Sequence, residues 1–251
     1  MTTTEHTGSG DLSRSLELLW DFGGKPARGP KPGLTLDRIV TAAVAVADAE
    51  GLEAVSMRRV ATELGAGTMS LYRYVPGKAE LLDLMLDKVN DVGDTTEYDP
   101  DLGWRGVLDL IAHGIWEMYT QHPWLLLVDQ ARPVLGPNAL AGLEISLGGI
   151  QDAALSDREK ITVLTLIEGY VHGLARGHVN SVRAEQRTGV SDKDFWDAQA
   201  PILEKAMNTG RYPLLAALDE DAFTGHSEAT FEFGLQRLLD GLETFIGHRS
   251  G

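Results

Sequence analysis

Residues 56–78 constrain the fold of this chain most, because they have the pattern of two short helices joined by a tight turn. Ser56 is a favourable N-cap, and the apolar positions of the first helix lie on one face: Val60, Ala61 and Leu64. Gly65 suits a left-handed helix stop, followed by a second helix over residues 68–74. The inward positions of that helix are Leu71 and Val75. The pattern predicts a helix-turn-helix.

The outer face of the second helix carries side chains suited to reading DNA. Short polar groups reach base edges in the major groove, arginine can donate a pair of hydrogen bonds to guanine, and an apolar group can pack on a thymine methyl. The candidates for base contacts are Thr68, Met69, Ser70, Arg73 and Tyr74. The candidates for phosphate contacts are Arg58, Arg59, Tyr72 and Lys78. The pattern alone leaves open a plain core helix pair with a solvated basic rim.

Residues 35–82 resemble the N-terminal DNA-binding domain of the tetracycline-repressor (TetR) family of bacterial regulators. The motif is L-G, a short turn, S-L-Y-x-[YH]-V, and G-K before an acidic, leucine-rich helix, present here as ELGAGTMSLYRYVPGKAELL. The resemblance implies DNA binding, with base contacts from Thr68, Met69, Ser70, Arg73 and Tyr74. It implies phosphate contacts from Arg58, Tyr72 and Lys78. Some relatives have glutamine or proline where this chain has Gly67-Thr68-Met69, so no operator sequence is carried over.

Composition limits the class of protein. The chain has 251 residues, of which 43% are hydrophobic and 24% charged, as in a soluble globular protein of one large or two modest domains. It has no cysteine, which excludes disulfides and thiolate chemistry and leaves only His and carboxylates for zinc. We expect no cofactor. There is no signal peptide and no apolar run of about 18 residues, so we expect a cytoplasmic protein without a membrane span.

The net charge of −15 argues at first against a nucleic-acid partner. Residues 25–78, however, hold eight Lys or Arg against five Asp or Glu, a local charge of +3. An acidic body behind a mildly basic head would repel non-specific DNA while leaving the head able to bind.

Three parts follow from these patterns: a flexible N-terminal extension (1–33), a helix-turn-helix domain (34–78) and a helical effector-binding and dimerisation domain (79–251). In the extension, residues 11–22 have the pattern of a short amphipathic helix. Residues 25–33 are rich in proline and glycine and should be extended. The basic residues Arg28 and Lys31 either enter a minor groove or belong to an idle linker.

The expected fold class is all-α, because apolar residues recur at helical spacing and no long alternating pattern occurs. The helices are expected at residues 35–50, 56–64, 68–74, 79–92, 104–121, 124–128, 137–154, 157–182, 191–207 and 227–246. Their order resembles the ligand-binding domain of the TetR family, in the branch nearest the tetracycline repressor. The helix of residues 79–92 would link the DNA-binding head to the body.

The last predicted helix has an apolar seam with steps of four and three. Its members are Phe231, Leu235, Leu238, Leu242 and Phe245. This seam either faces its own core or packs against a second copy. Apolar residues off this line indicate two neighbours: Phe233, Leu239 and Ile246. With the helix of residues 157–182, it could form a four-helix dimer interface, which the resemblance also implies.

Polar and aromatic residues inside expected buried helices are candidates for an effector site. We expect a mostly apolar pocket lined by His113, Trp116 and Trp124, with Glu168 or His172 as polar anchors. A buried Glu168 without a partner would cost several kcal/mol, so an ion pair with His172 or Arg176, or an interface contact, is an alternative. Glu168 and His172 alone are too few ligands for a metal site, and none is predicted.

The sequence therefore favours a homodimeric repressor that a small apolar or aromatic effector releases from a palindromic DNA operator. One alternative is an enzyme or metal-binding protein with a vestigial helix-turn-helix. No nucleophile elbow, phosphate loop, HExxH or paired-carboxylate motif supports it, so we predict no enzymatic activity. The other alternative is a DNA-organising protein without an effector.

Overall fold

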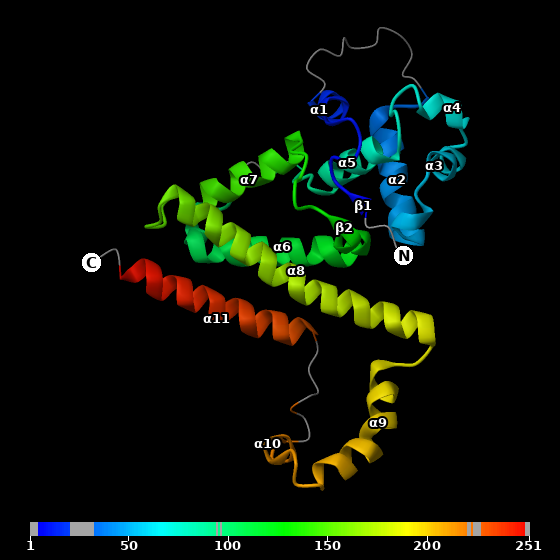
Figure 1. Ribbon diagram of the computed structural model, residues 1–251. Helices are drawn as coiled ribbons and strands as arrows, with labels where there is room; N and C mark the ends of the chain where they lie inside the picture. Colours follow the sequence, from blue (N-terminus) through cyan, green and yellow to red (C-terminus); the bar gives the residue numbers. More distant parts are fainter. Residues whose placement is uncertain are drawn as a thin grey trace. The chain divides into compact units, whose positions relative to one another are not determined.

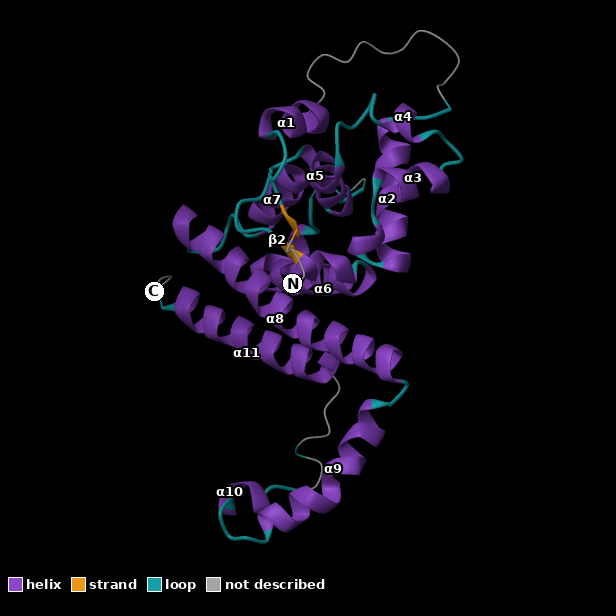
Figure 2. Cartoon of the chain, turned by 45° about the vertical axis from the view of Figure 1, so that its right-hand side comes forward, coloured by secondary structure: helices purple, strands orange, loops and turns teal. Residues whose placement is uncertain are grey.

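The computed structural model describes residues 5–20, 33–93, 95, 97–219, 222 and 227–248. Helices dominate these residues, so the all-α fold class is confirmed (Figures 1 and 2). Among the described residues the departure from all-α is one pair of two-residue strands. In it, β1 (Glu5–His6) pairs in parallel with β2 (Val128–Asp129).

The chain forms two compact units, Met1–Thr165 and Leu166–Gly251. The first contains β1, α1 (Leu12–Trp20), α2 (Leu36–Glu50), η1 (Leu52–Ala54), α3 (Met57–Glu63), α4 (Thr68–Leu71), α5 (Lys78–Val89), η2 (Pro100–Leu102), α6 (Gly103–Gln121), η3 (Pro123–Leu127), β2, α7 (Pro137–Gly149) and the start of α8 (Asp157–Thr188). The second contains the rest of α8, α9 (Asp192–Met207), α10 (Pro213–Ala216) and α11 (Ser227–Gly247). Helix α5 packs on α2 as well as on α1 and α7.

Side-chain caps begin three of the helices where the sequence predicts them. The side-chain oxygens of Thr35, Ser56 and Ser191 each accept a hydrogen bond from the backbone N–H three residues later, at 3.2, 3.1 and 3.0 Å. These bonds satisfy donors that have no partner within the helix.

Three helix ends differ from the prediction. The α-helix α4 ends at Leu71 and turns continue to Tyr74, whereas we expected helix over residues 68–74. Helix α7 ends at Gly149 rather than near residue 154, because Gly148 and Gly149 disfavour helix. Helix α8 continues to Thr188, directly before Gly189, rather than ending near residue 182.

The N-terminal extension is not flexible throughout, contrary to our expectation. Residues 5–20 form β1 and α1, and α1 packs on α5. The short amphipathic helix predicted in this region is confirmed. Residues 21–32, which include Arg28 and Lys31, lie outside the described residues, so the minor-groove hypothesis stays a prediction.

The core of the first unit around α4 is formed by the successive helices α2 to α5. Side chains with no exposed surface are Ile39 and Ala43 of α2, Val60 of α3, Leu71 of α4, Val75, and Leu81 and Met85 of α5. This core holds the inner side of α4 and leaves its outer side uncovered.

In the second unit, α8 and α11 lie side by side in both views (Figures 1 and 2). The Tyr170 ring of α8 stacks on Phe231 of α11 at a centroid distance of 6.2 Å, and its hydroxyl donates to the Phe231 carbonyl at 2.7 Å. The exposed fractions of Phe231 and Leu235 are only 3% and 0%. These two members of the expected dimer seam are therefore buried within their own chain.

Candidate nucleic-acid interface

The inner side of α4 packs in the core, which fixes the orientation of its outer face. Leu71 and Val75 have no exposed surface, which anchors the end of α4 in the core. Gly65 has a φ of +62°, the left-handed conformation expected for the turn. The Ser70 N–H donates to the Gly67 carbonyl at 2.8 Å, which closes the first turn of the helix.

The outer face of α4 presents most of the predicted base-reading side chains. Met69 is 76% exposed, so its apolar side chain is presented on the outer face of the helix. Arg73 is exposed, and Thr68 and Ser70 are half-buried. This set offers hydroxyl groups, a guanidinium and a methyl-packing group, the chemistry required to read a major groove.

Tyr74 differs from the prediction. It is half-buried, and its hydroxyl donates to the Leu34 carbonyl at 3.0 Å, directly before the start of α2. This hydrogen bond ties the end of the α4 segment to the entry of the domain. Tyr74 therefore has a positioning role in this structure, and its ring and hydroxyl are not freely presented for base contacts.

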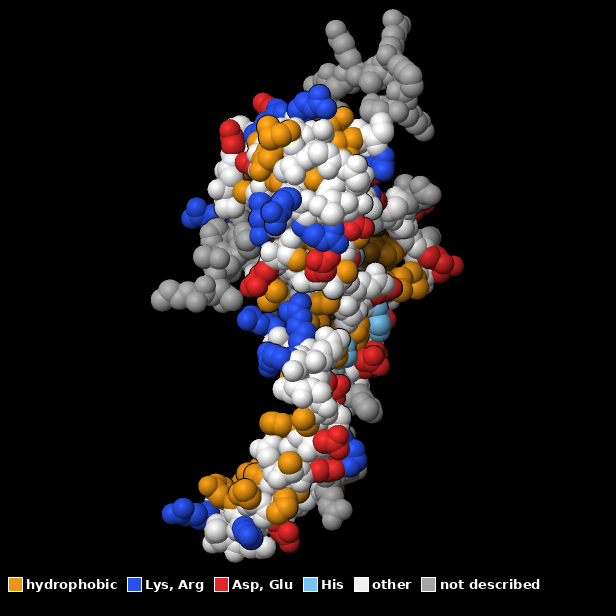
Figure 3. Space-filling view, turned by 90° about the vertical axis from the view of Figure 1, so that its right-hand side faces the viewer, with side chains coloured by type: hydrophobic (Ala, Val, Ile, Leu, Met, Phe, Trp, Pro, Cys, Tyr) orange, Lys and Arg blue, Asp and Glu red, His pale blue; other side chains and the backbone are white. Residues whose placement is uncertain are grey.

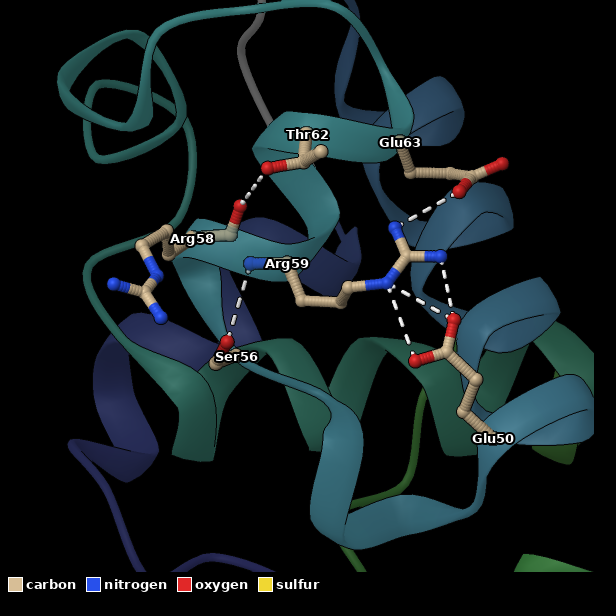
Figure 4. Close-up of polar contacts among 6 residues, drawn as sticks. All are labelled: Glu50, Ser56, Arg58, Arg59, Thr62 and Glu63. Atoms are coloured by element: carbon tan, nitrogen blue, oxygen red, sulfur yellow. Dashed lines mark hydrogen bonds and ion pairs between the residues drawn. The ribbon is translucent and has the colours of Figure 1, made fainter.

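The neighbouring arginines Arg58 and Arg59 have opposite surroundings (Figure 4). The Arg59 guanidinium donates to Glu50 at 2.5 Å and to Glu63 at 2.9 Å. The hydrogen bonds that Arg59 donates to Glu50, and then to Glu63, raise the pKa of Arg59 above its ordinary value. Among the residues that the structure describes, the Arg58 side chain has no ion-pair partner, and in Figure 4 it points away from this cluster. Arg58 is thus available to a phosphate and Arg59 is committed to the fold.

The ion pairs of Arg59 also depend on pH. The hydrogen bond from Arg59 lowers the pKa of the Glu50 carboxyl below its ordinary value. A carboxylate with a lowered folded-state pKa stabilises the fold above its unfolded-state pKa, and that contribution is lost as pH falls through the folded-state pKa. The Arg59 cluster therefore supports the head at neutral pH.

The phosphate-contact candidates flank α4. Arg58 and Tyr72 are exposed, and Lys78 is half-buried at the first position of α5. The N-cap of α5 is Gly77, which has no side chain to satisfy the N–H groups of the first turn. In Figure 3 the side that carries α3 and α4 faces the viewer, with Lys and Arg side chains spread over it. Such a surface can bind the sugar–phosphate backbone on both sides of a groove.

A hydrogen-bonded cluster of Asp48, His122 and the buried Trp124 joins α2 of the head to η3 after α6. One Asp48 carboxylate oxygen accepts a hydrogen bond from the Trp124 indole N–H at 2.8 Å. The same oxygen lies 2.8 Å from Nδ1 of His122. Trp124 has no exposed surface. Its polar edge thus binds the head rather than lining an effector pocket as predicted.

We expect Asp48→Ala to lower the free energy of unfolding by about 1–3 kcal/mol, because the buried indole N–H of Trp124 loses its acceptor. In a unit of this size, about 1 kcal/mol shifts the melting temperature by about 2–4 °C. Thermal and urea unfolding measure the change. The control is Glu53→Ala, which removes an exposed carboxylate of the same head. Equal stability of the two variants would contradict this role for Asp48.

The remaining effector candidates are placed as follows. His113 is exposed, with Nδ1 2.8 Å from the Asp109 carbonyl of its own helix. Trp116 is half-buried on α6. Glu168 is exposed and His172 half-buried, both on the α8 segment of the second unit. Within this single chain Glu168 lies off the buried stripe of α8, which includes Ile167, Val171, Ala175 and Val179.

Comparison with known proteins identifies the family. The family model "Bacterial regulatory proteins, tetR family" matches residues 39–85, and the model "Tetracyclin repressor-like, C-terminal domain" matches residues 98–246. The chain belongs to the TetR family. It is therefore a DNA-binding transcriptional regulator, and the plain core helix pair is ruled out.

Individual TetR-family proteins resemble the chain over most of its length. The transcriptional repressor DrrR1 of Streptomyces coeruleorubidus is 55% identical over 249 residues, 99% of this chain and 92% of that protein. ActR from Streptomyces coelicolor has TM-scores of 0.68 at 30% identity, both in its apo form and in complex with actinorhodin. The matches cover 87% of this chain and 99% and 100% of the two ActR chains.

The described residues contain no group of three or more His, Cys, Asp or Glu residues placed to hold a metal ion. Within the same residues, no helix is both long enough and apolar enough to span a membrane.

The residues that connect the head to the rest of the first unit could not be recognised from the sequence. Asp48, Glu80, Asp83 and Asp87 match no motif, and Arg59 appeared to be a phosphate contact. One available signal was the spacing of the α5 acids by three and four residues, which places them on one face of the helix. Glu80, Asp83 and Asp87 are only 7%, 1% and 6% exposed.

Proposed function

We propose that this TetR-family regulator is a homodimeric repressor that binds a palindromic operator through two copies of α4 and leaves it when a small apolar or aromatic effector binds. The observation that carries the proposal is the outer face of α4. Met69 of α4 and Arg73 of the turn after it are exposed, while the buried Leu71 fixes the inner side. This surface is free of contacts with the core and carries the side-chain types that read a major groove.

For the contacts with DNA, we assign base reading to Thr68, Met69, Ser70 and Arg73. We assign backbone contacts to Arg58, Tyr72 and Lys78. The assignment follows the exposure of each side chain and the position of Lys78 at a helix N-terminus. Tyr74 supports the end of the α4 segment through the Leu34 carbonyl.

For the homodimer, the uncovered faces of α8 and α11 supply the surface. Gly169, Gly173 and Gly177 follow at steps of four on α8, and added Cβ atoms there would meet nothing within 4 Å. A partner helix could therefore approach this face closely. On α11, Phe245 is 43% exposed, and Leu238 and Leu242 are half-buried. These residues keep the dimer role predicted from the seam, whereas Phe231 and Leu235 form the contact with α8 of the same chain.

Helices α9 and α10 add to the apolar surface left without cover. In these two helices no residue is buried. Their most exposed apolar side chains are Phe195, Trp196, Ile202 and Leu214, which are 53%, 55%, 71% and 83% exposed. A surface of this kind indicates burial in an assembly. It supports a dimer interface that includes α9 and α10 as well as the four-helix contact of α8 and α11.

For the effector, support comes from ActR, which has been crystallised with actinorhodin and shares 30% identity with this chain. Trp116 keeps its predicted role as the aromatic contact, because it is half-buried on α6. His113, Glu168 and His172 remain candidates for polar contacts. An effector that displaces α6 or η3 would act on the head through Asp48, which accepts the Trp124 hydrogen bond.

The release step requires two heads that meet successive major grooves about 34 Å apart. A tilt of α5, which begins directly at the phosphate-contact residue Lys78, would move each head out of register. To release DNA, the effector must bind the tilted state more tightly, by about 1–3 kcal/mol in typical allosteric coupling.

The test begins with selection of an operator from random duplexes, which should return two inverted half-sites. Actinorhodin is then titrated into the complex and DNA affinity is followed by fluorescence anisotropy. We expect a loss of affinity of about 5–150-fold, and a weaker response for Trp116→Ala. Leu110→Ala is the control, because Leu110 is exposed elsewhere on α6.

A selected operator with a single half-site would refute the palindrome. Firm operator binding that neither actinorhodin nor a library of aromatic compounds affects would refute the effector role and favour a DNA-organising protein.

A further inference from the structure

The N-terminal segment of residues 5–20 is bound to the chain between β2 and α7. Its strand β1 pairs with β2, and the Thr7 N–H donates to the Asp129 carbonyl at 3.2 Å. The Thr7 hydroxyl donates to the Arg132 carbonyl at 2.8 Å. At the other end of the segment, the Trp20 indole N–H donates to the Leu135 carbonyl at 3.1 Å. The segment is thus attached to residues 128–135 at both of its ends.

Between these attachments the same segment binds α5. The Ser15 hydroxyl donates to one oxygen of Asp83 at 2.7 Å, and the Gly8 N–H donates to the other at 3.0 Å. One turn earlier, the Asp11 N–H donates to a Glu80 carboxylate oxygen at 3.0 Å. Ser15 and Asp83 are 0% and 1% exposed.

These contacts are specific because they involve buried carboxylates. A buried carboxylate is costly unless its oxygens accept hydrogen bonds, and here the segment supplies the donors. Gly10 adds a steric constraint, since a Cβ at that position would overlap the Glu80 carboxylate and touch Ala79. The segment therefore fits α5 closely at one place and cannot slide along it without leaving Asp83 short of donors.

We propose that residues 5–20 form a strap that ties the first two turns of α5 to residues 128–135 and so limits the tilt of α5. Glu80 and Asp83 lie two and five residues after Lys78, at the end of α5 nearest the head. Ser15 and Gly10 are positioning residues, because they act on the head through α5. The strap holds the head in one arrangement before DNA binds, which favours operator affinity.

The decisive experiment is hydrogen–deuterium exchange of the full chain carrying Ser15→Ala or Gly10→Ala. The control is Ser13→Ala, an exposed serine on the same helix. With the strap weakened, amide exchange over α5 and residues 128–135 should rise about tenfold, the factor expected for loss of a hydrogen bond to a charged group. Exchange over α9 and α11 should not change.

Unchanged α5 exchange in both variants would overturn the strap, and so would a uniform rise across the chain, which would indicate global destabilisation. These outcomes need no DNA and are therefore independent of the proposed function.

The consequence for DNA rests on the proposed function and has its own measurement. Operator affinity of Ser15→Ala and Gly10→Ala should fall about fivefold or more, while Ser13→Ala binds as the unmodified protein does. Faster α5 exchange with unaltered operator affinity would overturn the role of the strap in DNA binding. Loss of operator binding by all proteins, including the unmodified one, would instead count against the proposed function.

Discussion

Arg73→Ala is expected to weaken binding to the operator by about 1–3 kcal/mol while binding to random DNA changes much less. Arg73 is exposed on the outer side of the α4 segment, beside the 76% exposed Met69. Its guanidinium is the only group of the assigned base-reading set that can donate a bidentate pair to guanine. Anisotropy titrations with the selected operator and with a scrambled duplex measure both affinities.

Two variants serve as controls for Arg73→Ala. Lys78→Ala should weaken both duplexes about equally and lower the slope of log K against log salt by about one unit, because one phosphate contact is lost. Arg158→Ala removes an exposed arginine at the start of α8 and should leave both affinities unaltered. Equal losses on operator and scrambled DNA for Arg73→Ala would show that Arg73 contacts phosphate rather than a base.

Leu238→Glu is expected to convert the dimer to monomers and to lower operator affinity by about 10²–10⁴-fold, the contribution of a second linked binding site. Leu238 of α11 is half-buried, and the neighbouring positions Leu235 and Leu239 are buried. A carboxylate there would have to be desolvated in a helix–helix interface without a counter-charge. Sedimentation velocity or light scattering gives the oligomeric state.

Thr244→Glu is the matched control, since it introduces the same charge on another side of α11. Thr244 is exposed, and its hydroxyl donates to the Asp240 carbonyl of its own helix. This variant should remain a dimer with unaltered operator affinity. A dimeric Leu238→Glu protein would refute the assigned interface, and a monomeric Thr244→Glu protein would show that the interface covers a different side of α11.

The selectivity of the head also depends on where the charges lie. The chain carries a net charge of −15, yet Arg58 and Arg73 are exposed beside α4. An acidic protein with basic residues on its reading surface binds non-specific DNA weakly, because most of its surface repels phosphate. The sequence alone would add Arg59 to this surface. Its guanidinium, however, forms ion pairs with Glu50 and Glu63.

Local sequence patterns predicted the helix-turn-helix well. Its N-caps Thr35 and Ser56, the Gly65 turn and the inward side chains Leu71 and Val75 are all where they were expected. Each depends on interactions within a few residues, such as a side-chain cap or a helix periodicity, and these are encoded locally. For the same reason the exposed Met69 and Arg73 could be found from the sequence.

Several side chains were misread because their partners are distant in sequence. Tyr74 bonds to the Leu34 carbonyl, and Trp124 bonds to Asp48, 76 residues away. No periodicity indicates which distant acceptor a buried tyrosine or tryptophan will find. Phe231 of the α11 seam is a similar case, since its contact with Tyr170 of α8 buries it within the chain.

The sequence by itself determined the all-α class, the reading helix and the surface it offers to DNA, because these follow from helix periodicity and from the chemistry of side chains that stay exposed. Only the tertiary structure decided that the acidic side chains of α5 are buried. Periodicity alone would leave Glu80 and Asp83 in solvent, yet both are buried under the segment of residues 5–20. Hydrogen bonds from a chain segment about 70 residues away make that burial possible, and such long-range pairing has no local signal.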